Sequence, residues 1–204
     1  MSETLLHSPL GPTTVHLCID MQCLLAPEGP WPTPWLAVAL ERQLLLVQHS
    51  AASTIFTRFI PPRSANEMPG TWRRYYDKWR RLTREFIDPN LLELVNPLRS
   101  FTPPAGIVDK TRYSAFLQSS LHATLARRRA DTLVVSGAET DVCVLATVLD
   151  AVDLGYRVVV ASDAVCSSSD ECHDALMTLY HRRFSEQIET AETEAILENW
   201  RIAG

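Results

Sequence analysis

Three residues of this sequence carry side chains that could act together on a carbonyl group: Asp20, Lys110 and Cys143. Each ends or follows a short apolar run that is typical of a buried strand. A cysteine thiol becomes a nucleophile when a base takes its proton, and a carboxylate can be that base. A lysine ammonium beside them would hold the carboxylate ionised and favour the thiolate. The three side chains therefore predict covalent catalysis, with Cys143 as nucleophile, Asp20 as base and Lys110 as electrostatic support.

Each of these residues also has a purely structural interpretation. A carboxylate that ends a strand often caps a turn, a lysine after a strand is usually solvated, and a cysteine in a helix is commonly a small buried apolar side chain. The six histidines are scattered, and none lies beside Cys143 in the sequence. The chemical interpretation therefore requires a fold that brings the three residues to one place.

The segment GAETDVC, residues 137–143, predicts how the thiol is presented. Thr140 is a residue type that caps helix N-termini, and it would begin a helix at Asp141. Cys143 would then lie in the first helical turn, where free N–H groups and the helix dipole favour a thiolate. The Asp141 carboxylate in the same turn opposes this effect.

Short runs rich in β-branched residues alternate with stretches of helical periodicity, which predicts an α/β protein with a parallel sheet. We expect strands at residues 14–20, 52–59, 107–109, 132–137 and 157–163, and a weaker sixth at 187–189. We expect helices near residues 34–50, 67–86, 118–129, 141–154 and 170–184. Ligands bind at the carboxyl ends of the strands in such sheets. The three chemical residues fall at these ends, on strands that we expect to be neighbours.

The composition limits the classes of protein that fit. The chain has 204 residues, 46% hydrophobic and 21% charged, with a formal charge of -5. These values indicate one globular domain over residues 1–204, without a global attraction to nucleic acid or anionic lipid. No apolar run is long enough to span a membrane, and residues 1–12 lack the pattern of a secretory signal, so we expect a cytoplasmic protein. Five cysteines, with Cys18 and Cys166 inside apolar runs, indicate reduced thiols.

The segments IDMQ (19–22), VDKTRYSAF (108–116) and the stretch 136–169 that begins SGAETDVCVLATVLDA contain the three residues in order. Together they resemble the isochorismatase-like cysteine hydrolase superfamily, which includes nicotinamidases, N-carbamoylsarcosine amidohydrolase and ureide hydrolases. The resemblance implies a three-layer α/β/α Rossmann-like fold with a mainly parallel sheet of about six strands. It also implies a homodimer or homotetramer, and it assigns a catalytic triad to Asp20, Lys110 and Cys143.

The resemblance further implies a cis peptide bond between Ala138 and Glu139, which is costly where no proline follows. In the superfamily this bond directs the N–H of the residue equivalent to Glu139, together with that of Cys143, toward a developing oxyanion. The resemblance and the flanking sequence also indicate a substrate pocket, for which the candidate residues are Gln22, Arg58, Phe59, Trp72 and Tyr113.

Two departures from the family patterns narrow the chemistry. Nicotinamidases carry an Asp and His metal cluster after the second strand, where this chain has TRFIPPRS, with Phe59 and Pro61 near the ligand positions. We therefore expect neither a metal nor another cofactor. Isochorismatases that cleave a vinyl ether usually lack the cysteine. Its retention here favours hydrolysis of a C–N bond in a small amide, carbamoyl or ureide substrate through a thioester.

Other interpretations stay open. The chain could be a catalytically idle ligand-binding member of the superfamily, or a thiol redox or sensor protein that uses Cys143. Residues 71–85, TWRRYYDKWRRLTRE, form a basic and aromatic patch whose aromatic spacing of three and four indicates a packed helical stripe rather than nucleic-acid binding. In resembling proteins this region forms part of the pocket rim or an oligomer contact. An alternative role for Arg58, Arg73 or Arg74 is to pair with a substrate carboxylate. Asp163 resembles a family residue that anchors a turn.

Overall fold

The computed structural model describes residues 6–201. The expectation about a leader, which rests on residues 1–12, and the outer limits of the expected 1–204 domain therefore lie partly outside the described residues. Within them, no helix is both long and apolar enough to cross a membrane.

Six parallel strands form one sheet in the order β3-β2-β1-β4-β5-β6. The strands are β1 (Thr14–Ile19), β2 (Thr54–Phe59), β3 (Gly106–Lys110), β4 (Thr132–Ala138), β5 (Arg157–Cys166) and β6 (Ile188–Ala191). The prediction of an α/β fold with a parallel sheet is confirmed. The chain reverses direction across the sheet between β1 and β4, and the carboxyl ends of these two neighbours form the crevice where such sheets bind ligands.

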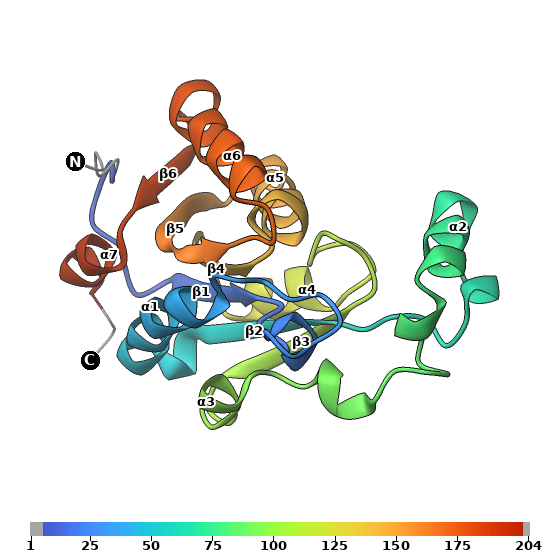
Figure 1. Ribbon diagram of the computed structural model, residues 1–204. Helices are drawn as coiled ribbons and strands as arrows, with labels where there is room; N and C mark the ends of the chain where they lie inside the picture. The colour runs from blue at the N-terminus through green and yellow to red at the C-terminus, as the bar shows by residue number, and fades with distance from the viewer. Residues whose placement is uncertain (1–5, 202–204) are drawn as a thin grey trace.

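Helices cover both faces of the sheet (Figure 1). They are α1 (Leu36–His49), α2 (Gly70–Lys78), α3 (Asn96–Arg99), α4 (Leu121–Arg127), α5 (Leu145–Asp153), α6 (Asp170–Arg183) and α7 (Thr193–Asn199). Buried side chains of α4, α5 and α6 pack on one face, and those of α1, α3 and α7 pack on the other. The three layers follow from strands that are apolar on both sides and so must be covered on both sides.

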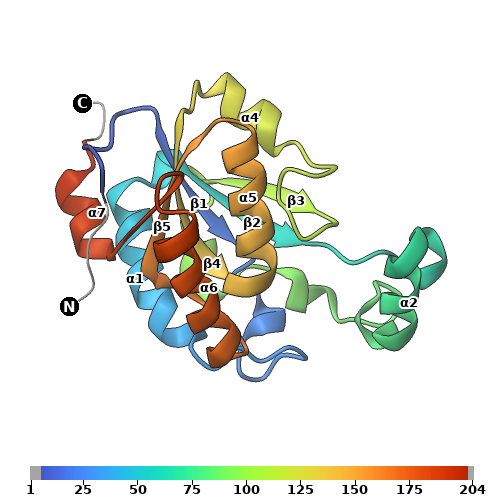
Figure 2. The same cartoon turned by 90° about the horizontal axis from the view of Figure 1, so that it is seen from above.

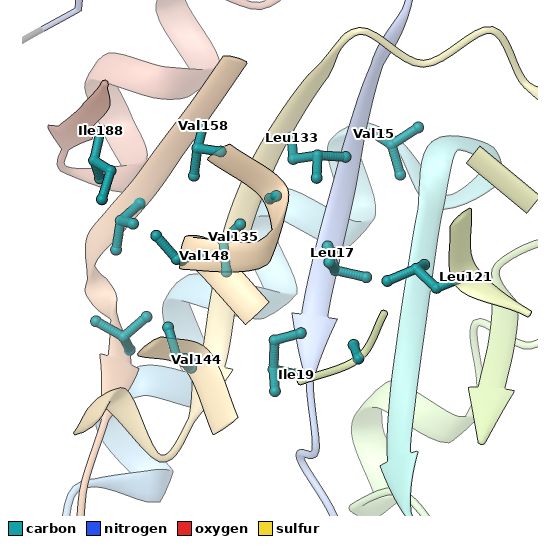
Figure 3. Packing of buried hydrophobic residues seen from close by; sticks show 14 of the residues in the cluster. Val15, Leu17, Ile19, Leu121, Leu133, Val135, Val144, Val148, Val158 and Ile188 are labelled. Atoms are coloured by element: carbon teal, nitrogen blue, oxygen red, sulfur yellow. The ribbon is translucent and has the colours of Figure 1, made fainter. Parts of the chain in front are cut away.

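Alternation along each strand divides the buried side chains between the two faces of the sheet. Val15, Leu17 and Ile19 of β1 point toward the cluster under α4, α5 and α6, which Figure 3 shows together with residues of the neighbouring strands. Cys18 points to the opposite face. His16, between Val15 and Leu17 in β1, is fully buried. Its imidazole lies 2.8 Å from the Ser136 hydroxyl of β4 and 3.3 Å from the Thr54 hydroxyl of β2. A polar bridge therefore links the three central strands inside an otherwise apolar layer.

Several predicted boundaries differ from the structure. The helix expected at 67–86 is broken: α2 ends at Lys78, and Arg80–Leu82 form a separate 3-10 turn. The break falls at Trp79, whose ring packs edge-on against Trp31 at 5.9 Å between centroids. β5 continues to Cys166, three residues beyond its predicted end, through a register shift against β4. The short helices α3 and α7 were not predicted.

Residues 61–88, which we call the arm, leave the sheet between β2 and β3. Figures 1 and 2 show α2 projecting away from the helices that cover the sheet. The arm is attached to the body through a small apolar cluster of Phe59, Met68 and Tyr76, with Trp31 and Tyr75 packed against it. The aromatic stripe predicted in this segment thus packs partly on itself and partly on the loop after β1.

Candidate active site

The three chemical residues meet at the carboxyl edge of the sheet. Asp20 directly follows β1, Lys110 is the last residue of β3, and Cys143 lies five residues after the end of β4. β1 and β4 are neighbours as expected, but β2 separates β3 from β1. The Lys110 side chain spans this gap: it is in register with Phe59 of β2, and its ammonium lies 5.1 Å above the centre of that ring.

A buried ion pair forms the centre of this cluster. Lys110 Nζ lies 2.6 Å from Asp20 Oδ2, and the two side chains are 0% and 3% exposed. The ammonium also donates to the backbone carbonyls of Arg112 at 2.9 Å and Tyr113 at 3.0 Å, and it lies 3.3 Å from Cys143 Sγ. An ammonium has three hydrogens, and four acceptors here surround it. Lys110 therefore has no free donor to offer a substrate.

Thr57 of β2 fixes the other oxygen of the carboxylate. Its hydroxyl donates to Asp20 Oδ1 at 2.6 Å and accepts from the Asp20 backbone N–H at 3.1 Å. Asp20 itself has φ of +49°, in the left-handed region that non-glycine residues seldom occupy. Sequence reasoning missed Thr57, because nothing in one sequence distinguishes this threonine from any other buried strand residue.

The surroundings of the Cys143 thiol favour its protonated form. Burial raises its pKa, and the Asp20 carboxylate acts in the same direction, whereas the Lys110 ammonium lowers it without reversing the shift. The effect of burial therefore exceeds that of the Lys110 ammonium, which favours the thiolate. Burial also disfavours the charged form of Lys110, but Asp20 and Cys143 outweigh it and leave the pKa of Lys110 raised. The site consequently holds a neutral thiol next to a matched pair of charges.

The turn that presents Cys143 differs from the predicted helix start. Thr140–Val144 form a π-helical turn, in which the N–H groups of Val142 and Val144 both donate to the Glu139 carbonyl at 3.1 Å. Thr140 does not cap this turn, since its hydroxyl instead bonds to the His173 ring at 2.9 Å. The Ala138–Glu139 peptide bond that precedes the turn is cis.

A cavity of about 260 Å³ opens in front of Asp20 and Cys143. Of the expected pocket residues, Gln22, Phe59 and Tyr113 line it. The Gln22 amide is fully engaged with the backbone, since it donates to the Phe59 and Leu92 carbonyls and accepts from the Phe59 N–H. Ala138 and Glu139, expected at the site as the cis peptide and an oxyanion donor, also line it, whereas sequence reasoning did not place the other wall residues, which are Leu24, Leu25, Pro30, Trp31, Pro32, Tyr75, Val142 and Ser168.

Two expected pocket residues lie elsewhere. Strand alternation turns Thr57 and Phe59 toward the site and Arg58 away from it. Arg58 pairs instead with Asp109 at 2.8 Å and Glu93 at 3.0 Å. Trp72 is absent from the cavity wall and packs behind Tyr113, with 4.7 Å between ring centroids.

Other residues singled out from the sequence have structural partners. Arg73 of the arm donates to Asn66. Asp163 accepts from the backbone N–H and the hydroxyl of Thr193, both at 2.8 Å, and so anchors the start of α7. Phe59 and Pro61 are the residues that the resemblance sets near the metal-ligand positions of nicotinamidases. Phe59 lines the cavity, and the Pro61 carbonyl accepts a hydrogen bond from the Arg84 side chain. Across residues 6–201, no group of three or more His, Cys, Asp or Glu side chains is arranged to hold a metal ion.

A parallel sheet in this order, with a thiol, a carboxylate and an ammonium at the crevice, places the chain in one family. The chain belongs to the isochorismatase family, whose domain model matches residues 14–192.

Individual relatives agree with this assignment. Maleamate amidohydrolase of Pseudomonas putida is 30% identical over 173 residues, covering 78% of this chain and 75% of that protein. The uncharacterized isochorismatase family protein PncA of Bacillus subtilis is 36% identical over 86 residues, covering 42% of this chain and 47% of that protein. The chain thus spans about half the length of that relative. Among solved structures, a cysteine hydrolase from Pseudomonas syringae superposes with a TM-score of 0.80 at 25% identity, covering 98% of each chain.

Proposed function

We propose that the chain is a cysteine hydrolase that cleaves the C–N bond of a small amide, carbamoyl or ureide substrate through a thioester. The observation that carries the proposal is the contact of Lys110 with both Asp20 and Cys143 at the floor of a cavity. A thiol with a base and a fixed counter-charge is the arrangement that nucleophilic catalysis requires.

In the first half-reaction, Asp20 takes the proton from Cys143 as Sγ attacks the carbonyl carbon. The backbone N–H groups of Glu139 and Cys143 are the donors that we assign to the resulting oxyanion. The C–N bond then breaks as Asp20 returns the proton to the departing nitrogen, which leaves as ammonia or an amine. The acyl group remains on Sγ as a thioester.

In the second half-reaction, the oxygen of a water molecule attacks the thioester carbonyl carbon while Asp20 takes a proton from that water. The C–S bond breaks, the sulfur regains a proton from Asp20, and the acid leaves. Lys110 stays charged throughout and balances the carboxylate whenever Asp20 is ionised. Its donors to the Arg112 and Tyr113 carbonyls fix its position, so the balance costs no reorganisation during the reaction.

The amidohydrolase among the relatives supports C–N hydrolysis, and the raised pKa of Cys143 argues against a redox sensor. Sensor cysteines are low-pKa thiolates that react with oxidants unaided. A thiol that is neutral at rest and faces a carboxylate suits a nucleophile that ionises only when a substrate is in place.

The experiment is ammonia release from a panel of small amides and ureides, with hydroxylamine added to capture an acyl-enzyme as its hydroxamate. We expect wild-type turnover and hydroxamate, background rates for Cys143→Ala, and a loss of at least about 100-fold for Asp20→Asn. Cys172→Ala is the matched control, because Cys172 is exposed and lies outside the cavity wall. Turnover that survives Cys143→Ala would disprove the thioester route, and release from no compound would favour an idle ligand-binding protein.

A further inference from the structure

The charges around the cavity are unevenly distributed. Its wall contains two carboxylates, Asp20 and Glu139, and among residues 6–201 no arginine, histidine or lysine lines it. Lys110 lies behind the wall, and its charge is matched to Asp20 at 2.6 Å. The Glu139 side chain accepts from the Ser168 backbone N–H at 3.1 Å and forms no ion pair with any described residue. The Glu139 carboxylate therefore lies beside the cavity without a cationic partner among the described residues.

The nearby cations are fixed in other contacts. Arg58 is held by Asp109 and Glu93 on the far side of β2. Arg112 donates to the Thr111 carbonyl and lies 5.5 Å above the Trp72 ring, behind the aromatic wall. Neither guanidinium can reach a substrate without giving up these partners, so neither is placed to bind a substrate carboxylate.

Most of the other wall residues are apolar or aromatic. The Trp31 and Phe59 rings are tilted by 44° with 6.5 Å between their centroids, and Tyr75 of the arm and Tyr113 complete the aromatic side. Burial raises the pKa of Tyr75, and Tyr113, Cys143 and Glu139 add to the shift, so its phenol stays neutral beside the thiol. This wall suits a planar substrate body that needs little solvation.

We propose that the site selects uncharged planar amides against amides that carry a carboxylate, and that the Glu139 side chain is the residue that determines this selectivity. The proposal rests on the hydrolytic function above and adds the substrate class to it. An anionic substituent would lose its water, find no cation and meet a like charge, and each of these effects disfavours binding.

The test compares isosteres, since nitro and carboxylate groups share a planar shape and differ in charge. The substrates are 4-nitrobenzamide and 4-carboxybenzamide, with the 3-substituted pair to vary the direction of the group. Dividing each kcat/KM by the hydroxide-catalysed rate of the same amide removes the electronic difference. We expect the nitro compounds to be favoured by at least about 100-fold, which corresponds to about 2.7 kcal/mol.

Two variants test the assignment to Glu139. Glu139→Gln should reduce the discrimination about tenfold. Ser168→Lys should reduce it further, because Ser168 is exposed, lies on the wall and holds the Glu139 carboxylate through its backbone, so a lysine there would place a cation at the site. Ser168→Met is the matched control of similar length without charge, and it should retain the wild-type ratio.

The outcomes separate the two proposals. Equal efficiency toward nitro and carboxy amides, with activity that depends on Cys143, would overturn the selectivity and leave the hydrolysis intact. If neither pair is hydrolysed, calorimetric titration of both amides into Cys143→Ala measures the charge selectivity directly. Binding of the carboxy amide at least as tightly as the nitro amide, or binding of neither, would then overturn the inference.

Discussion

Removing both partners of the Asp20–Lys110 ion pair should lower the free energy of unfolding by less than the sum of the two single removals. The pair is 2.6 Å long, and its side chains are 3% and 0% exposed. Asp20→Asn leaves a buried ammonium without its counter-charge, and Lys110→Met leaves a buried carboxylate in the same state. Loss of one partner from such a pair costs about 3–5 kcal/mol. The double variant buries two neutral side chains, so its loss should fall short of the sum by at least about 2 kcal/mol.

The assay is urea unfolding of all four proteins at pH 7, followed by tryptophan fluorescence and extrapolated linearly to water. The matched control is the same cycle on Arg63 and Glu85, whose side chains are 73% and 40% exposed and 3.8 Å apart, and whose coupling should be close to zero. If the losses for Asp20 and Lys110 add to within about 0.5 kcal/mol, the two charges are not coupled. The electrostatic role that we assign to Lys110 would then be wrong.

Two further predictions concern metal and acid. Dialysis against a strong chelator should leave the hydrolytic rate unchanged, because the resemblance implies that Phe59 and Pro61 stand near the positions where nicotinamidases carry metal ligands; activity that is lost and then restored by one divalent metal would disprove this. Acid should weaken the fold through His16, since burial lowers its pKa to about 3 from 6.5. The unfolded chain binds this proton below pH 6.5 and the folded chain does not, so stability falls by about 1.4 kcal/mol per pH unit between these limits. Urea unfolding at pH 7, 6 and 5 should show this slope in the wild type and a shallower one in His16→Gln, and parallel slopes would contradict it.

The sheet and the meeting of Asp20, Lys110 and Cys143 at its edge could be predicted because both depend on local patterns. Buried parallel strands are short apolar runs, and the residue after such a run lies at the carboxyl edge whatever the order of the strands. This reasoning located Asp20, Lys110 and Cys143 without knowledge of which strands are neighbours. It wrongly expected β3 to be a neighbour of β1. β2 lies between them, and the long side chain of Lys110 reaches across it.

The cavity wall and the protonation of the thiol could not be predicted in the same way. The wall combines residues from separate segments of the chain, from Asp20 to Ser168, and their meeting depends on tertiary packing. Arg58 was misplaced because a one-residue shift along a strand reverses the face of the sheet. The pKa of Cys143 depends on how completely water is excluded, and a sequence pattern for a helix start does not contain that information.

The arm contributes to the cavity wall but supplies none of the three proposed catalytic residues. The three side chains that we propose as catalytic come from the end of β1, from β3 and from the turn after β4, whereas Tyr75 reaches the wall from a segment between β2 and β3 that adds no strand to the sheet. The length and composition of the arm can therefore change without shifting the register of any strand in the sheet. Sequence changes confined to the arm would therefore alter the substrate preference of the cavity and leave the proposed catalytic residues in place.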